Sequence, residues 1–390
     1  MKRTFLAGLL VFTAAAVFGA SQEMEFYQQM YSLASAAVEK NQVFQEAVNS
    51  DLPDATDFYA WVLERLVMEY PNVKGNQNIE ATNESMKTLA KLLGEAGHLP
   101  SAGYLWRAET IFADPIVKGE ILIALGKMKA VDFLPQVIQT LNDMNAGRAS
   151  RNSQGRERVA FGAIVSLENY GDPKGYLPVY IASIGWYSET VKRQAEASLP
   201  KILEDPVEPM TELIQSPSYP YSTKYEALRT IENSSVSNDV KSDFAVTSYI
   251  EAWRSVTANL LERMDLVKIR KLCISMINRY KTDNTLVYPL LERSYTGGND
   301  EEEKFGAVTA LASLASDESV RLLSSFVGII NEKLRDGSLR QSDERMMRVL
   351  IPALGQTGRS EAAPALRSIQ GVDWPQAVKR LAAEELKKVQ

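Results

Sequence analysis

Residues 343–369, DERMMRVLIPALGQTGRSEAAPALRSI, contain the pattern that indicates how this chain folds. Apolar residues recur there with the helical spacing i, i+3, i+4, i+7: Met347, Leu350, Ile351 and Leu354. This spacing places one apolar stripe along a helix. Gly355 and Gly358 are expected to end the helix, because glycine adopts the left-handed backbone angles common at helix C-termini.

A second short helix is expected to begin near Ser360, whose hydroxyl can cap free backbone amides. Ala363, Leu366 and Ile369 supply its apolar stripe. Pro364 falls in its first turn, where the missing N–H would have had no helical partner. The stretch is therefore predicted to form an antiparallel helical hairpin.

The same combination of a leucine and a proline ten or eleven residues later recurs along the chain. The pairs are Leu125 and Pro135, Leu167 and Pro178, Leu199 and Pro209, and Leu354 and Pro364. The earlier segments are VKGEILIALGKMKAVDFLPQVIQTL (117–141), RVAFGAIVSLENYGDPKGYLPVYIAS (158–183) and VKRQAEASLPKILEDPVEPMTELIQS (191–216). Weaker copies are predicted at residues 80–109, 224–251, 267–293 and 304–330, with a closing half-repeat at 374–390.

These segments resemble the HEAT or HEAT-like (PBS-lyase-type) repeat family. In that family a helix A ending in Ala-Leu-x-x-Leu-Gly-Asp leads to a helix B that carries Pro-x-Leu. The Gly-Asp turn is complete only at Gly171 and Asp172, and residues 221–296 depart from the pattern. The resemblance implies an all-α, right-handed α-solenoid of antiparallel helical hairpins, armadillo-like in type, over residues 79–390. Neighbouring hairpins in such arrays bury each other's apolar faces.

The first 20 residues have the layout of a secretory signal peptide. Lys2 and Arg3 precede an apolar run from Phe5 to Phe18, which small residues follow. The run is shorter than the ~20 residues that a membrane span needs. We therefore expect a cleavable leader over residues 1–20, a periplasmic or secreted protein, and no membrane span after leader removal. An uncleaved anchor is the alternative.

Residues 21–78 lack the repeat pattern. Two helices are expected there, over residues 24–49 and 54–70, separated by Asp51-Leu-Pro53. We interpret this segment as an N-terminal helical cap, because the first unit of a solenoid needs one face covered and the other polar.

Composition excludes several classes of function. The net charge of −6 disfavours binding to phosphate backbones, so no nucleic-acid partner is expected. His98 and Cys273 are the only residues of their types, which excludes an intramolecular disulfide and His- or Cys-based metal clusters. Phosphate-binding glycine loops are also missing from the sequence. No cofactor, no metal and no enzymatic activity are therefore expected.

Two polar loops carry arginines in this acidic chain. The first, residues 145–158, contains Arg148, Arg151, Arg156 and Arg158, and the second, residues 333–345, contains Arg335, Arg340 and Arg345. Arginine can hold a carboxylate or phosphate through two hydrogen bonds. Both loops lead from a predicted helix B to the next helix A, so they are predicted to form rims of a binding surface. The alternative is that they are solvated insertions.

Aromatic residues suggest another binding surface. Tyr176 and Tyr180 lie four residues apart in a predicted helix B, and Trp186 follows them. If exposed, they could stack on a sugar or pack against a peptide. Alternatively, they seal the core between repeats.

These observations favour an exported scaffold that binds another protein or peptide through a solenoid surface and performs no chemistry. One alternative is a cell-wall glycan or peptide binder that uses Tyr176, Tyr180 and Trp186. Another is a lyase-like enzyme, because HEAT-like repeats also occur in bilin lyases.

Overall fold

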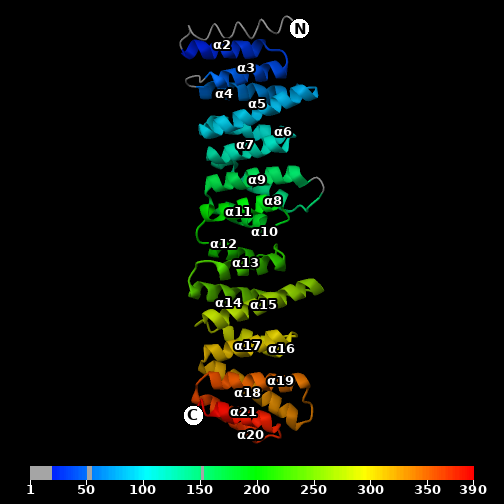
Figure 1. Ribbon diagram of the computed structural model, residues 1–390, viewed down its shortest axis with the longest axis vertical. Helices are drawn as coiled ribbons and strands as arrows, with labels where there is room; N and C mark the ends of the chain where they lie inside the picture. The colour runs from blue at the N-terminus through cyan, green and yellow to red at the C-terminus, as the bar shows by residue number, and fades with distance from the viewer. Residues whose placement is uncertain (1–19, 51–54, 151–152) are drawn as a thin grey trace. The chain divides into compact units, whose positions relative to one another are not determined.

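The computed structural model describes residues 20–50, 55–150 and 153–390, and these ranges contain helices and loops but no strand. The chain divides into two compact units, an N-terminal unit that ends at Glu204 and a C-terminal unit that begins at Asp205. Apart from Ala20, the predicted leader lies outside the described residues. Figure 1 shows that the helices within each unit stack one upon the next.

In the N-terminal unit the helices form two layers. Layer A contains α3 (Ala37–Asn49), α5 (Asn76–Glu95), α7 (Pro115–Lys127), α9 (Ser153–Tyr170) and α11 (Glu189–Ile202). Layer B contains α2 (Ala20–Leu33), α4 (Ala55–Glu69), α6 (Ala102–Ile111), α8 (Leu134–Asn145) and α10 (Tyr176–Ile184). Each A helix packs on the next A helix, and each B helix packs on the A helix that follows it in sequence.

The C-terminal unit repeats this arrangement. Its layer A contains α13 (Tyr221–Asn233), α15 (Leu260–Tyr280), α17 (Glu301–Leu314), α19 (Gln341–Gln356) and α21 (Gln376–Leu386). Its layer B contains α12 (Val207–Gln215), α14 (Asn238–Arg254), α16 (Val287–Gly297), α18 (Asp317–Arg335) and α20 (Ala363–Gln370). Residues 221–296, where the repeat pattern is weakest, form α13–α16. The predicted all-α solenoid of helical hairpins is confirmed.

The proline marker correctly located the second helix of each hairpin. Pro135, Pro178, Pro209 and Pro364 lie in the first turns of α8, α10, α12 and α20. Short 3-10 turns precede α6, α8, α10 and α20; they are η2 (Leu99–Ser101), η3 (Val131–Phe133), η4 (Pro173–Gly175) and η5 (Ser360–Ala362). A further turn, η1 (Tyr70–Asn72), follows α4.

The two glycines of residues 343–369 have different roles. Gly358 has φ +64° and forms the turn, as predicted. Gly355 does not end the helix, because α19 continues to Gln356. A Cβ at Gly355 would lie 1.8 Å from Oε2 of Glu385 on α21, so this glycine allows the close approach of the next helix.

The first predicted helix of the N-terminal segment is divided in two. α2 and α3 are separated at residues 34–36, where the backbone N–H groups of Ser35 and Ala36 donate to Oε2 of Glu39 at 3.0 and 3.2 Å. A carboxylate that accepts these amides begins a new helix. Phe44 and Phe58 from this segment share one core with Leu89 of α5, so the segment continues the same two layers.

Close helix contact in layer A of the N-terminal unit depends on small residues. A Cβ on Gly162 of α9 would lie 2.5 Å from the Cα of Gly119 on α7, and a Cβ on Gly126 would lie 2.6 Å from the Cα of Ser166. Backbones therefore touch along this pair, and a larger side chain would force the helices apart.

Antiparallel hairpins place the connecting loops of a unit at two opposite edges. We call the edge where the chain passes from a B helix to the next A helix the return edge. In the N-terminal unit its loops include residues 34–36, 70–75, 112–114 and 185–188, and the loop that begins at Ala146. In the C-terminal unit they are residues 216–220, 255–259, 298–300, 336–340 and 371–375.

Candidate functional site

Three grooves lie on return edges, each between two consecutive return loops. The first groove is in the N-terminal unit, and the second and third are in the C-terminal unit.

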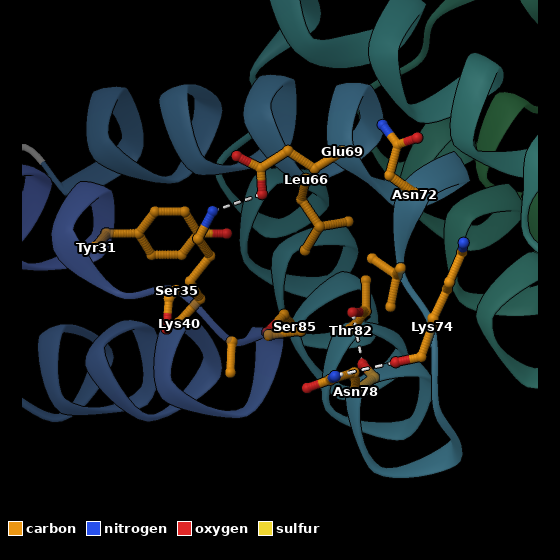
Figure 2. Close-up of a pocket in the computed structure, with 13 residues that line it drawn as sticks. Tyr31, Ser35, Lys40, Leu66, Glu69, Asn72, Lys74, Asn78, Thr82 and Ser85 are labelled. Atoms are coloured by element: carbon orange, nitrogen blue, oxygen red, sulfur yellow. Dashed lines mark hydrogen bonds and ion pairs between the residues drawn. The ribbon is translucent and has the colours of Figure 1, made fainter.

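The first groove has a volume of about 290 Å³ and lies between residues 34–36 and 70–75. Figure 2 shows the ion pair on one side of it, where Nζ of Lys40 on α3 lies 2.6 Å from Oε2 of Glu69 on α4. The same ammonium lies 5.3 Å from the ring centre of Tyr31. Burial, together with the charge of Glu69, raises the pKa of Tyr31. The phenol is therefore neutral beside the ion pair.

Most polar groups of the first groove already have partners inside the protein. Thr82 donates to the carbonyl of Asn78 at 2.7 Å, and Ser85 donates to Oδ1 of Asn41 at 2.7 Å. The amide of Asn78 donates to the carbonyl of Lys74 at 3.0 Å, as Figure 2 shows. Because these hydroxyls and amides are engaged, this groove offers a ligand few free donors.

The second groove is larger, with a volume of about 650 Å³, and lies between residues 216–220 and 255–259. Tyr219 and Tyr221 line it together with Lys224. Nζ of Lys224 is buried and donates to the carbonyl of Ile214 at 2.7 Å. Burial lowers the pKa of this ammonium, against the opposing effect of Glu251.

Exposed apolar side chains border the second groove and form what we call the α15 patch. Its members and their exposed fractions are Val256 (93%), Leu260 (64%), Leu261 (71%) and Met264 (51%). Leu261 also lines the groove. The C-terminal unit exposes six large apolar side chains, and four of them lie in this patch. Such a cluster marks an interaction surface more often than scattered exposed residues do.

The third groove has a volume of about 460 Å³ and lies between residues 298–300 and 336–340. Its floor includes Tyr295, whose ring stacks on Phe326 with centroids 3.7 Å apart. Ile329 is 45% exposed there. Across the groove, Nζ of Lys333 on α18 lies 2.7 Å from Oδ1 of Asp343 on α19.

A buried polar cluster in the C-terminal unit was not predicted from the sequence. Arg270 on α15 donates to both carboxylate oxygens of Glu303 on α17, at 2.7 and 3.0 Å. Ser294 donates to the same carboxylate at 2.7 Å, and the hydroxyls of Tyr249 and Ser294 lie 2.5 Å apart. The run at residues 299–303 is an acidic helix start, in which Asp300 accepts from the backbone N–H of Glu303. The pairing of Arg270 with Glu303 has no local sequence signal, because they are 33 residues apart.

The first arginine loop does not act as one group. Arg148 and Arg158 are exposed, and Arg151 lies outside the described residues. Arg156 has partners within the protein, because its Nη2 donates to the carbonyl of Met144 at 3.2 Å and its guanidinium lies over the Trp186 ring. Arg156 therefore caps the C-terminal end of α8 by binding a backbone carbonyl there.

The aromatic residues do not form an exposed platform. Tyr176 and Tyr180 are buried, so the alternative that they seal the core is correct. Trp186 is half-buried and stacks on Tyr187 with centroids 4.3 Å apart. Its indole N–H donates to the carbonyl of Met144 at 3.2 Å.

In the second arginine loop, Arg335 and Arg340 are exposed as expected. Arg335 pairs with Glu332 at 2.5 Å, whereas the backbone N–H of Arg340 donates to Oδ2 of Asp343 at 2.9 Å. Arg340 is therefore bonded through its backbone to Asp343, which lines the third groove. The two arginine loops belong to different units, so the idea of one shared rim stays a prediction.

Within residues 20–50, 55–150 and 153–390, no helix combines the length and apolar character needed to cross a bilayer. The same ranges contain no group of three or more His, Cys, Asp or Glu side chains arranged to hold a metal ion.

Comparison with known proteins gives a distant likeness. No family model matches the chain, and none of the curated proteins matches it. The resemblance to HEAT-like repeats therefore stays a prediction. Among solved structures, human deoxyhypusine hydroxylase in complex with glycerol is similar, with 13% identity and a TM-score of 0.27. The match covers 77% of this chain and 96% of that chain.

This comparison contradicts the prediction that the chain is not an enzyme, because the similar solved structure is that of a hydroxylase. The missing phosphate loops and histidine clusters exclude particular chemistries and not catalysis as a whole. At this TM-score the likeness assigns no activity to the chain.

Proposed function

We propose that the chain is an exported binding protein that holds another protein or peptide along the return edge of its C-terminal unit. The observation that carries the proposal is the α15 patch, where Val256 and Leu261 are 93% and 71% exposed. Covering such side chains is favourable by about 25 cal/mol per Å² of apolar surface. The second groove, lined by Tyr219 and Tyr221, adds a concave surface beside the patch.

The helical framework supports this function because it orders the surface before a partner arrives. Leu260, Leu261 and Met264 lie in the first two turns of α15, a helix of 21 residues. Layer A holds that helix between α13 and α17. A surface that is already ordered loses less conformational entropy on binding.

The test is crosslinking in the producing cells, followed by purification and mass spectrometry of the crosslinked positions. A double variant, Leu260→Ser with Leu261→Ser, should lose a discrete partner that the wild-type protein retains. Its melting temperature should not fall, because both side chains are exposed. Leu286→Ser is the matched control, since Leu286 is 54% exposed on the opposite edge of the same unit. If the double variant recovers as much partner as the wild-type protein, the α15 patch is not part of the binding site.

Export is tested separately by determining the N-terminus of the mature protein. A start within the first residues after the apolar run would support the leader, whereas an intact Met1 in the purified protein would contradict it.

A further inference from the structure

We infer that the third groove receives an acidic segment of the partner protein, with one apolar side chain as an anchor. This inference rests on the proposed function and names the chemistry of the partner at a second place on the same edge. Residues 255–259 and 298–300 are consecutive return loops. A segment that runs along the edge from the α15 patch therefore meets the third groove next.

The apolar anchor is suggested by the floor of the groove. Tyr295 and Phe326 form a stacked aromatic base, and half-buried Phe305 and buried Met346 lie beside it. Ile329 is nearly half exposed although it faces this apolar base. An aliphatic or aromatic side chain placed there would cover Ile329 and contact the edge of Tyr295.

The acidic groups of the groove already have partners. Oδ1 of Asp343 is held by Lys333 at 2.7 Å, and Oδ2 accepts the backbone N–H of Arg340 at 2.9 Å. Burial acts to raise the pKa of Asp343, but these hydrogen bonds outweigh it and the pKa is lowered. Glu301 lies 3.8 Å from the guanidinium of Arg345. A basic ligand would have to displace one of these pairs.

Two cations at or beside the groove form no such ion pair, although the charge of Arg340 acts on Asp343 and helps to lower its pKa. Lys304 on α17 lines one wall. Arg340 does not line the groove itself but immediately precedes α19, whose Ser342 and Asp343 line the other wall. Neither side chain has an acidic group within ion-pair distance among the residues that the structure describes. A carboxylate that reaches them would form charge-assisted hydrogen bonds without breaking an existing pair. The free charge at this groove is therefore positive, although the chain as a whole carries −6.

The experiment uses three fluorescein-labelled synthetic peptides and the full-length protein, with binding measured by fluorescence anisotropy. The peptides carry the same leucines and phenylalanine and differ only in the flanking residues, which are glutamate, glutamine or lysine. The glutamate peptide should bind roughly tenfold more tightly than the glutamine peptide, and its affinity should fall as salt is added. A single-stranded oligothymidylate serves as an anionic probe without carboxylates.

Charge reversal then locates the site. Lys304→Glu and Arg340→Glu should each lower the affinity for the glutamate peptide by roughly tenfold. Lys387→Glu, at an exposed lysine after α21, should leave binding unchanged. Ile329→Ser should weaken the binding of all three peptides, because it removes the apolar contact that they share.

Several outcomes would overturn the inference. They are equal binding of the three peptides, equal binding of the oligothymidylate, and wild-type affinity in the Lys304 and Arg340 variants. Partner recovery in cells that still depends on Leu260 and Leu261 would support the proposed function even then. In that case only the inference that the partner segment is acidic would be rejected. If partner recovery does not depend on the α15 patch, the proposed function falls whatever the peptides show.

Discussion

Arg270 and Glu303 form a two-point ion pair in the interior of the C-terminal unit, with the Glu303 carboxylate fully buried. The pair joins consecutive A helices, α15 and α17. The hydroxyl of Ser294 on α16 donates a further hydrogen bond to the carboxylate of Glu303. Arg270 also lies 4.2 Å from the ring centre of Trp253 on α14. One buried cluster therefore links four helices that belong to three consecutive hairpins.

Arg270→Ala should lower the free energy of unfolding by about 3–5 kcal/mol, because it leaves a buried carboxylate without its counter-charge. Arg335→Ala is the control, since its pair with Glu332 is exposed and should contribute about 0–1 kcal/mol. Urea denaturation followed by circular dichroism measures both. Similar losses of unfolding free energy in the two variants would show that the buried pair stabilises the protein no more than the exposed pair does.

Gly162→Ala should destabilise the N-terminal unit by about 1–3 kcal/mol, because the new Cβ would overlap the Cα of Gly119. Gly328→Ala should instead stabilise the protein by about 0.5–1 kcal/mol. Gly328 is an exposed glycine within α18, and a Cβ there meets open space. Thermal melts of the two variants should shift in opposite directions, and a shift in the same direction would contradict the packing argument.

Arg156→Ala should lower the melting temperature, whereas Arg148→Ala should not. The Arg156 guanidinium satisfies carbonyls at the end of α8 and covers the ring of Trp186, and its loss is expected to cost about 1–3 kcal/mol. Arg148 is exposed. If Arg148 contributes to partner binding, its reversal to glutamate weakens binding in a salt-dependent way at constant stability. Unchanged affinity would exclude it from the binding surface.

Alkaline pH should destabilise the N-terminal unit through its buried tyrosines. Burial raises the pKa of Tyr176 to about 12, above the value of about 10 in an unfolded chain. The buried phenol contributes its full stability below pH 10, and that contribution is lost as pH rises towards 12. Tyr176→Phe should therefore lose less stability than wild type across that interval. An identical pH profile for the two proteins would mean that the pKa of Tyr176 is not raised by folding.

The hairpins were predictable because their signals are local. The apolar stripe of residues 343–369 depends on residues within two turns of one helix, and the Leu-to-Pro marker depends on residues ten or eleven positions apart. The break between α2 and α3 was missed because it lacks glycine and proline, and it depends on Glu39 accepting the amides of Ser35 and Ala36.

The candidate site was predictable only in part. The second arginine loop does border a groove, and Arg340 was named from its sequence position alone. The α15 patch was missed, because an apolar run such as Leu260-Leu261 has the same composition whether it is buried or exposed. Conversely, Tyr176 and Tyr180 looked suited to binding and are buried.

By itself, the sequence determined that the chain forms repeated helical hairpins, since helix periodicity and the Leu-to-Pro spacing are properties of neighbouring residues. Only the tertiary structure decided which side chains face solvent. Arg156 donates a hydrogen bond to a carbonyl at the end of α8, and Glu303 pairs with Arg270, which is 33 residues away in the sequence. The side chain of Leu261 remains exposed to solvent. Burial and pairing depend on which helix packs against which, and that is set by the whole array of neighbours in a unit and not by any one stretch of its sequence.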